Sequence, residues 1–154
     1  MISVPVTAAS VFQASVTAFD EPIISESSAL HFGSIFNQTG SSCALDNTGV
    51  VSGACMSGHE NISVGVIGIS GLVANQEYQI EVVGSDNGVL RYQPEIMVDS
   101  VLRSNVDVNQ RISVTTIQNS DALTISIFGN LEVLSNLQAD GVYQAAYTVN
   151  VNFQ

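Results

Sequence analysis

The sequence of 154 residues contains no lysine and no tryptophan, and its 14 acidic residues are balanced by only three arginines. The resulting formal net charge of −11 excludes the basic stripe that nucleic-acid binding needs, and it disfavours anionic membrane surfaces. Without lysine the chain performs no Schiff-base catalysis and forms no lysine–asparagine isopeptide crosslink. Only 11% of residues are charged and 45% are hydrophobic, so we expect one globular domain rather than an acidic disordered segment.

Long apolar runs are also missing. None approaches the roughly 20 residues that span a bilayer, so we expect no membrane insertion. The N-terminus has neither a basic region nor a continuous apolar stretch, so the sequence shown contains no intact signal peptide. If the protein is secreted, this sequence is a mature form.

The two cysteines, Cys43 and Cys55, lack the spacing of a metal or redox motif. His59 follows Cys55 by four residues, which leaves a two-ligand metal site as an alternative. Between the cysteines, residues 46–49 (Asp-Asn-Thr-Gly) are typical of a hairpin turn. The sequence therefore predicts a disulfide across a β-hairpin, formed in an oxidising compartment and contributing about 3 kcal/mol to stability.

Apolar residues alternate with polar ones along most of the chain, and turn sequences separate the alternating runs. This pattern predicts about nine or ten short strands and an all-β sandwich. The first strand is expected over residues 11–19, before Pro22, and the last over 143–153. Further strands are expected at 61–70, 76–83, 89–97, 112–114, 123–127 and 131–133.

The N-terminal residues form a separate alternating segment. Ile2, Val4 and Val6 alternate with polar residues, but Pro5 argues against a central strand of the chain's own sheet. Two interpretations remain open: an unstructured terminus, or a strand intended for another subunit.

Five parts of the sequence stand out: Leu30-x-Phe32-Gly33-x-Ile35, the Cys43–Cys55 hairpin, Gly71 to Ile80 with Tyr78, Leu131-x-Val133, and Gly141-x-Tyr143 continuing through Tyr147, Val149 and Val151 to Phe153. Together these motifs resemble secreted bacterial pilin-like β-sandwich domains, the chaperone–usher pilus subunits of the archaic, spore coat U-like type. Two departures are the late position of Cys43 and the sequence Phe128-Gly129-Asn130-Leu131, which replaces the usual Gly-Thr-Leu approach to a late strand.

The resemblance implies an incomplete immunoglobulin-like β-sandwich with an N-terminal donor strand. Residues 1–10 would be the donor-strand extension and residues 11–154 the sandwich, which ends on the 143–153 strand and leaves an apolar groove. The implied donor residues are Ile2, Val4, Val6 and Ala8, and the implied acceptor groove comprises Phe32, Ile35, Tyr143, Tyr147, Val149, Val151 and Phe153.

The same resemblance implies a structural subunit of an extracellular bacterial pilus that polymerises head to tail by donor-strand exchange. Its partners would be identical subunits, a periplasmic chaperone and an outer-membrane usher, and adhesion or biofilm roles would follow from the polymer. Alternatives are a monomeric carbohydrate-binding or adhesin module, and a viral coat sandwich. We expect no enzyme, cofactor or metal, because no nucleophile, base and oxyanion site come together; Gly68-Ile69-Ser70-Gly71 lacks the setting of a nucleophile elbow.

Overall fold

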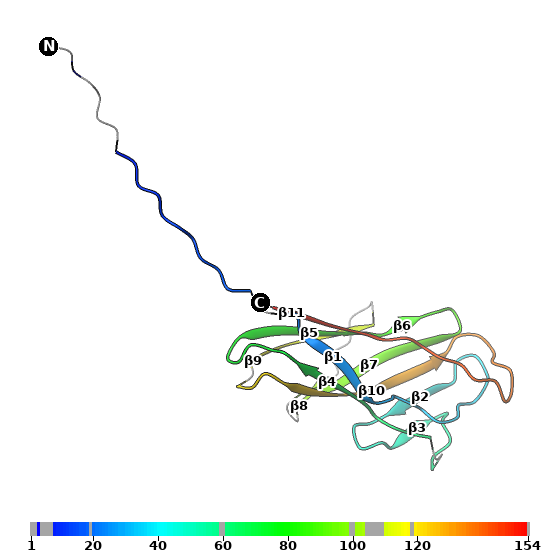
Figure 1. Ribbon diagram of the computed structural model, residues 1–154. Coiled ribbons are helices and arrows are strands. Elements are labelled where there is room, and N and C mark those ends of the chain that lie inside the picture. Colours follow the sequence, from blue (N-terminus) through cyan, green and yellow to red (C-terminus); the bar gives the residue numbers. More distant parts are fainter. Residues whose placement is uncertain are drawn as a thin grey trace.

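The computed structural model describes residues 3, 8–18, 20–58, 61–98, 101–103, 110–117 and 119–153. Within these residues the chain forms strands and loops, with no helix (Figure 1). The strands are β1 (Ile23–Ser28), β2 (Ser42–Leu45), β3 (Val51–Gly53), β4 (Gly65–Ser70), β5 (Glu77–Val83), β6 (Ser85–Asp86), β7 (Leu90–Val98), β8 (Val101–Arg103), β9 (Arg111–Ile117), β10 (Leu123–Val133) and β11 (Thr148–Phe153).

The larger sheet is organised around β10, its longest strand. Along one side β10 pairs first with β4 and then with β2, and along the other side it pairs with β7. β1 extends this sheet beyond β4, β3 extends it beyond β2, and β6 and β8 pair with β7. All of these pairings are antiparallel.

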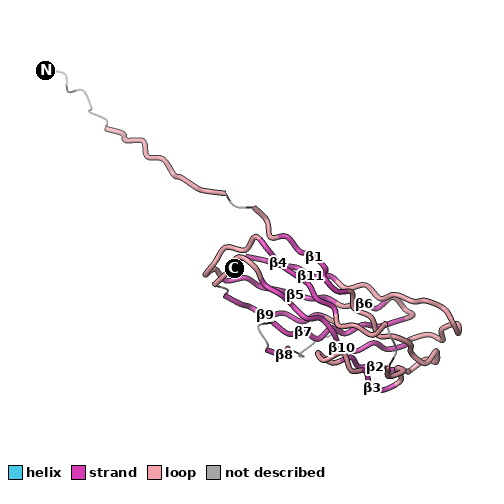
Figure 2. Tube along the Cα trace, turned by 60° about the horizontal axis from the view of Figure 1, so that its bottom comes forward, coloured by secondary structure: helices cyan, strands magenta, loops and turns pink. Residues whose placement is uncertain are grey.

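The smaller sheet has the order β11-β5-β9, and Figure 2 shows it lying over the larger sheet. Alternation explains the packing: in β7 every second side chain, from Leu90 to Val98, is buried. The main core joins buried residues of both sheets, including Ile80 and Val82 of β5 and Ile125 and Ile127 of β10. The prediction of an all-β, immunoglobulin-like sandwich is therefore confirmed.

The predicted disulfide hairpin is also present. β2 and β3 pair around the turn, in which Asp46 accepts hydrogen bonds from the backbone N–H groups of Thr48 and Val50. Asp46 also accepts a hydrogen bond from the Thr48 hydroxyl. This bond first, and then the backbone bonds, lower the pKa of Asp46. Cys43 and Cys55 are bonded, with their Cα atoms 5.3 Å apart. The hairpin covers a second apolar cluster whose buried members are Cys43, Leu45, Val51 and Phe128.

Gly129 lies in the middle of β10, where that strand passes from β4 to β2, and its φ of +127° favours glycine. An added Cβ would lie 2.7 Å from the backbone nitrogen of Glu95 on β7. The close approach of β7 to β10 therefore depends on the missing side chain.

Two strand predictions at the ends of the chain are wrong. Residues 11–18 form no strand and are exposed, so the first strand of the sandwich is β1. The last strand begins at Thr148, not at Tyr143. Alternation makes a segment able to form a strand, but a ladder also needs a neighbouring backbone, and residues 11–18 extend away from the sandwich (Figure 1).

Candidate functional site: an apolar groove between two sheet edges

An apolar groove of about 410 Å³ lies where an edge of the larger sheet approaches an edge of the smaller one. β1 ends the larger sheet and pairs only with β4 among the described strands, while β11 ends the smaller sheet and pairs only with β5. The groove is lined by Ile24, Glu26, Ile67, Ala145, Ala146, Tyr147 and Val149.

Strand periodicity places these side chains. Ile24 and Glu26 are two residues apart on β1 and point the same way. Tyr147, which directly precedes β11, has the same relation to Val149 of β11. Ile67, which is 4% exposed, comes from β4 beneath them. Ile23 and Ile24 remain 65% and 41% exposed, so β1 presents apolar surface at an edge that an added strand could cover.

One hydrogen bond crosses the groove. The Tyr147 hydroxyl donates to Glu26 Oε2 at 3.2 Å, and the Tyr147 ring meets the Tyr92 ring edge to face at 6.1 Å. Burial, helped by the charge of Glu26, raises the pKa of Tyr147 to about 12. Tyr147 therefore stays neutral at ordinary pH and remains a donor to the carboxylate.

β11 is held to the sandwich by β5. Val149 and Val151 lie opposite Val82 and Ile80, both buried, and Phe153 packs edge to face on Tyr78 at 5.6 Å. The Tyr78 hydroxyl in turn accepts a hydrogen bond from the Val73 N–H. One edge of β11 is thus paired with β5, and its apolar side chains pack on the core. The other edge of β11 adjoins the groove.

The groove contains two of the residues predicted for it, Tyr147 and Val149. Val151 and Phe153 follow on the same strand. Phe32 and Ile35 instead pack against both apolar clusters, and the Tyr143 hydroxyl accepts a hydrogen bond from the backbone of Gln138. The sequence did contain one signal for β1 as an apolar edge, the adjacent Ile23 and Ile24. The lining residues that sequence reasoning missed are Ile24, Glu26, Ile67, Ala145 and Ala146.

Of the predicted donor residues, Ile2, Val4 and Val6 lie outside the described residues. Ala8 is described: it is exposed and belongs to no strand.

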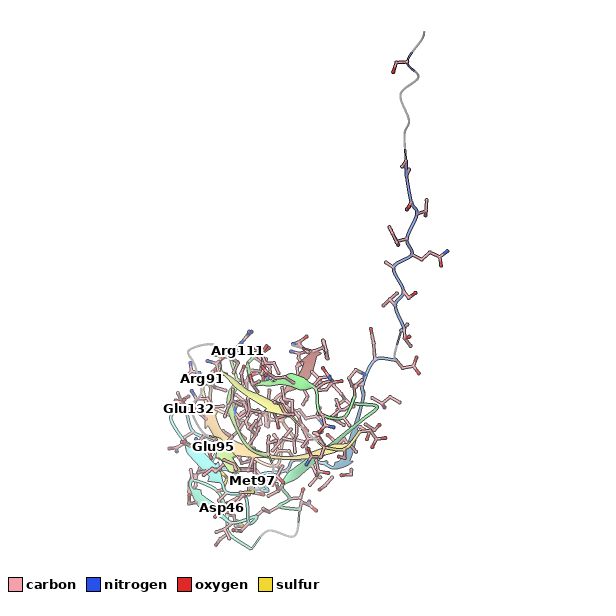
Figure 3. All side chains as sticks on the ribbon, turned by 90° about the vertical axis from the view of Figure 1, so that its left-hand side faces the viewer. Asp46, Arg91, Glu95, Met97, Arg111 and Glu132 are labelled. Carbon is pink, nitrogen blue, oxygen red and sulfur yellow. A yellow bond between two sulfur atoms is a disulfide. The ribbon has the colours of Figure 1, made fainter. Side chains whose placement is uncertain are left out.

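Among the residues that the structure describes, no three His, Cys, Asp or Glu side chains come close enough to hold a metal ion. His31 Nδ1 accepts a hydrogen bond from the Gly33 N–H at 2.9 Å, and His59 lies outside the described residues. Arg91 pairs with both Asp86 and Glu132 on the larger sheet. Figure 3 labels Arg91 and Glu132, which lie near each other. No helix of the described chain is long and apolar enough to cross a membrane. Among the described residues, the groove beside β1 and β11 is therefore the candidate site that we consider further.

Comparison with known proteins gives a family without an assigned activity. No curated protein and no solved structure matches the chain significantly. One family matches residues 23–153, from the first residue of β1 to the last of β11, which is nearly the whole sandwich. The chain therefore belongs to the family described as domain of unknown function DUF4402.

Proposed function

We propose that this protein is a structural subunit of an extracellular bacterial filament, in which each copy inserts an N-terminal strand into the groove of the next. The observation that carries the proposal is the groove itself, because it lies between β1 and β11, the end strands of two stacked sheets. An extended segment added there would extend the β11-β5-β9 sheet by β-augmentation and cover the apolar edge.

The energetics favour strand addition over salt bridges. Copies that each carry a net charge of −11 repel one another, and the arginines Arg91 and Arg111 already pair with acidic groups of their own chain. Association therefore rests on backbone hydrogen bonds and on apolar burial, which is worth about 25 cal/mol per Å². Each added Val or Phe side chain that enters the groove contributes to this term.

The accompanying proposals concern compartment and partners. A disulfide fits an oxidising compartment such as the periplasm and the cell exterior. A groove that exposes apolar edge surface before assembly would need a chaperone to cover it, and an outer-membrane usher to exchange that chaperone for the next subunit. Adhesion and biofilm formation would be properties of the polymer, and no catalysis is proposed.

Electron microscopy and gel electrophoresis of the secreted protein test this proposal. We expect filaments, and a ladder of oligomers in unboiled samples that collapses on heating, as kinetically trapped strand exchange requires. Ala146→Trp should fill the groove and abolish the ladder. Gln144→Trp, an exposed position two residues earlier that does not line the groove, is the matched control and should leave the ladder intact.

Three results would contradict the proposal. A wild-type protein that is monomeric under all conditions would remove its basis, above all if that monomer bound glycans. Closed shells in place of fibres would point to a coat protein. Equal ladders from Ala146→Trp and wild type would show that assembly does not use the groove.

A further inference from the structure

The described N-terminal residues 8–18, here called the tail, carry large apolar side chains in full contact with solvent. Val11, Phe12 and Val16 are 93%, 89% and 95% exposed. Figure 3 shows the tail side chains standing clear of the sandwich. Exposed apolar side chains gathered in one short segment mark an interaction site.

The tail has the pattern of a strand with one apolar face. Side chains at even positions are apolar and those between them are polar from Gln13 to Thr17, so an extended backbone would present the two sets on opposite sides. The apolar face consists of Phe12, Ala14, Val16 and Ala18, and the polar face of Gln13, Ser15 and Thr17.

From this pattern we propose, on the basis of the filament function above, that residues 11–18 are the donor strand. They lie in the β1–β11 groove of a second copy, antiparallel to β11, with Phe12, Ala14, Val16 and Ala18 facing its core. This assignment replaces residues 2–8 as the inserted segment.

Length and backbone chemistry favour the tail over residues 2–8. Eight extended residues reach about 26 Å, which lies between the roughly 20 Å of β11 alone and the roughly 30 Å of β11 with the three groove residues that precede it. Residues 11–18 contain neither proline nor glycine, so every N–H can join a ladder, whereas Pro5 would remove one. If residues 2–8 were inserted, Val11, Phe12 and Val16 would stay in a connecting segment, exposed.

Charge favours an N-terminal occupant, although it does not separate the tail from residues 2–8. The first charged residue of the chain is Asp20, so the whole of residues 1–19 is free of acidic and basic side chains. Among the residues that line the groove, Glu26 alone carries a charge. A neutral segment can approach the sandwich of another copy without the electrostatic repulsion that acts between two sandwiches, each of which carries the net charge of −11.

Strand direction makes the assembly an open chain. The tail leads into β1 at one end of the sandwich, and β11 ends at that same end (Figures 1 and 2). A donor antiparallel to β11 therefore runs in the direction of β1, and its own body lies beyond the opposite end. Only residues 19–22, which reach about 14 Å at most, join the donor to that body. Each copy thus receives at one end and donates from the other, which builds a filament rather than a closed pair.

Substitutions in the full chain test which face is inserted. Val16→Arg should reduce the unboiled ladder at least about tenfold, because the groove would have to bury a charge. Thr17→Arg carries the same charge on the opposite face and should stay within about twofold of wild type, as should Val4→Arg. All three sites lie before β1, so the thermal midpoint of the monomer should not change, and this measurement checks that each variant folds.

Crosslinking tests the partner strand directly. Ser15→Cys should form an intermolecular disulfide with a cysteine placed at one of the outward positions of β11, Thr148, Asn150 or Asn152. Ser3→Cys should not. If wild-type protein forms no filaments, the filament function fails and the donor assignment with it. If filaments form but Ser3→Cys crosslinks, or Val16→Arg and Thr17→Arg behave alike, the donor assignment alone is wrong.

Discussion

The tail and β11 have similar sequences and opposite surroundings. Both alternate apolar and polar residues and both contain valine, phenylalanine and uncharged polar side chains. β11 pairs with β5 along its whole length, and its Val149 and Val151 pack against the main core. In the tail, Val11, Phe12 and Val16 stay about nine-tenths exposed. The difference teaches that alternation makes a segment able to form a strand, and that a neighbouring backbone decides whether it does.

The reason lies in the free energy of a ladder. Ordering a residue costs about 1–2 kcal/mol of conformational entropy, and a lone pair of strands is marginal in water. β11 recovers this cost because β5 offers hydrogen bonds and the buried side chains of Ile80 and Val82. The tail would recover it in the groove of another copy.

The largest expected effect comes from removing the support of β11. Tyr78→Ala should lower the free energy of unfolding by about 4 kcal/mol, because Tyr78 is buried and holds both Phe153 and the Val73 N–H. Urea unfolding measures the change. Gln79→Ala, on the other face of β5, is the control and should cost less than about 1 kcal/mol. A similar loss in both variants would show that β11 does not depend on the core face of β5.

A second loss of stability is expected away from the groove, in the β2–β3 hairpin with its Cys43–Cys55 disulfide, here called the disulfide lobe. Cys43→Ala together with Cys55→Ala should lower the free energy of unfolding by about 3 kcal/mol, since the bond closes a loop of sequence separation 12. None of the groove-lining residues belongs to the lobe's apolar cluster. Urea unfolding of the double variant and of wild type measures the change in the free energy of unfolding. A change near zero would contradict the prediction.

A matched pair of phenylalanines sharpens the comparison itself. Phe153→Ala should lower the unfolding free energy of the monomer by about 1 kcal/mol, because Phe153 packs on Tyr78 although it is 52% exposed. Phe12→Ala should change it by less than about 0.3 kcal/mol, because that side chain is 89% exposed. Equal costs in the monomer would mean that the tail already packs on its own body.

The last effect is confined to alkaline pH. The pKa of Tyr147 is about 12 in the folded protein, against about 10 in an unfolded chain. Folding therefore favours the neutral phenol, and this contribution to stability is complete below about pH 10 and lost as pH rises through about 12. Tyr147→Phe should show a shallower decline of stability over that range in thermal melts. An unchanged decline would assign it to other groups, such as Tyr92, whose pKa burial also raises.

Local chemistry made parts of the structure predictable. The Asp46 turn was readable because its side chain bonds to backbone groups two and four residues away, and that turn pairs β2, which carries Cys43, with β3, which ends two residues before Cys55. The alternation of residues 76–83 predicted β5 for the same reason: parity along one strand is a local property.

The groove was harder to predict because its walls come from distant parts of the chain. Ile24 and Tyr147 are more than a hundred residues apart, and Ile67 belongs to a third segment. Among the predicted groove residues, Phe32 looked equivalent to Val149, since both are apolar residues in alternating runs. Both pack against the main cluster, and only the stacking of the sheets shows that Val149 also lines the groove whereas Phe32 does not.

By itself the sequence determined the all-β class, the disulfide hairpin and the strongly negative net charge, because periodicity, turn chemistry and net charge are properties of neighbouring or summed residues. The tertiary structure alone decided which alternating segments have a partner and which two edges enclose the groove. Strand pairing is a contact between segments far apart in the chain, and an alternating pattern carries no record of which segment it will meet.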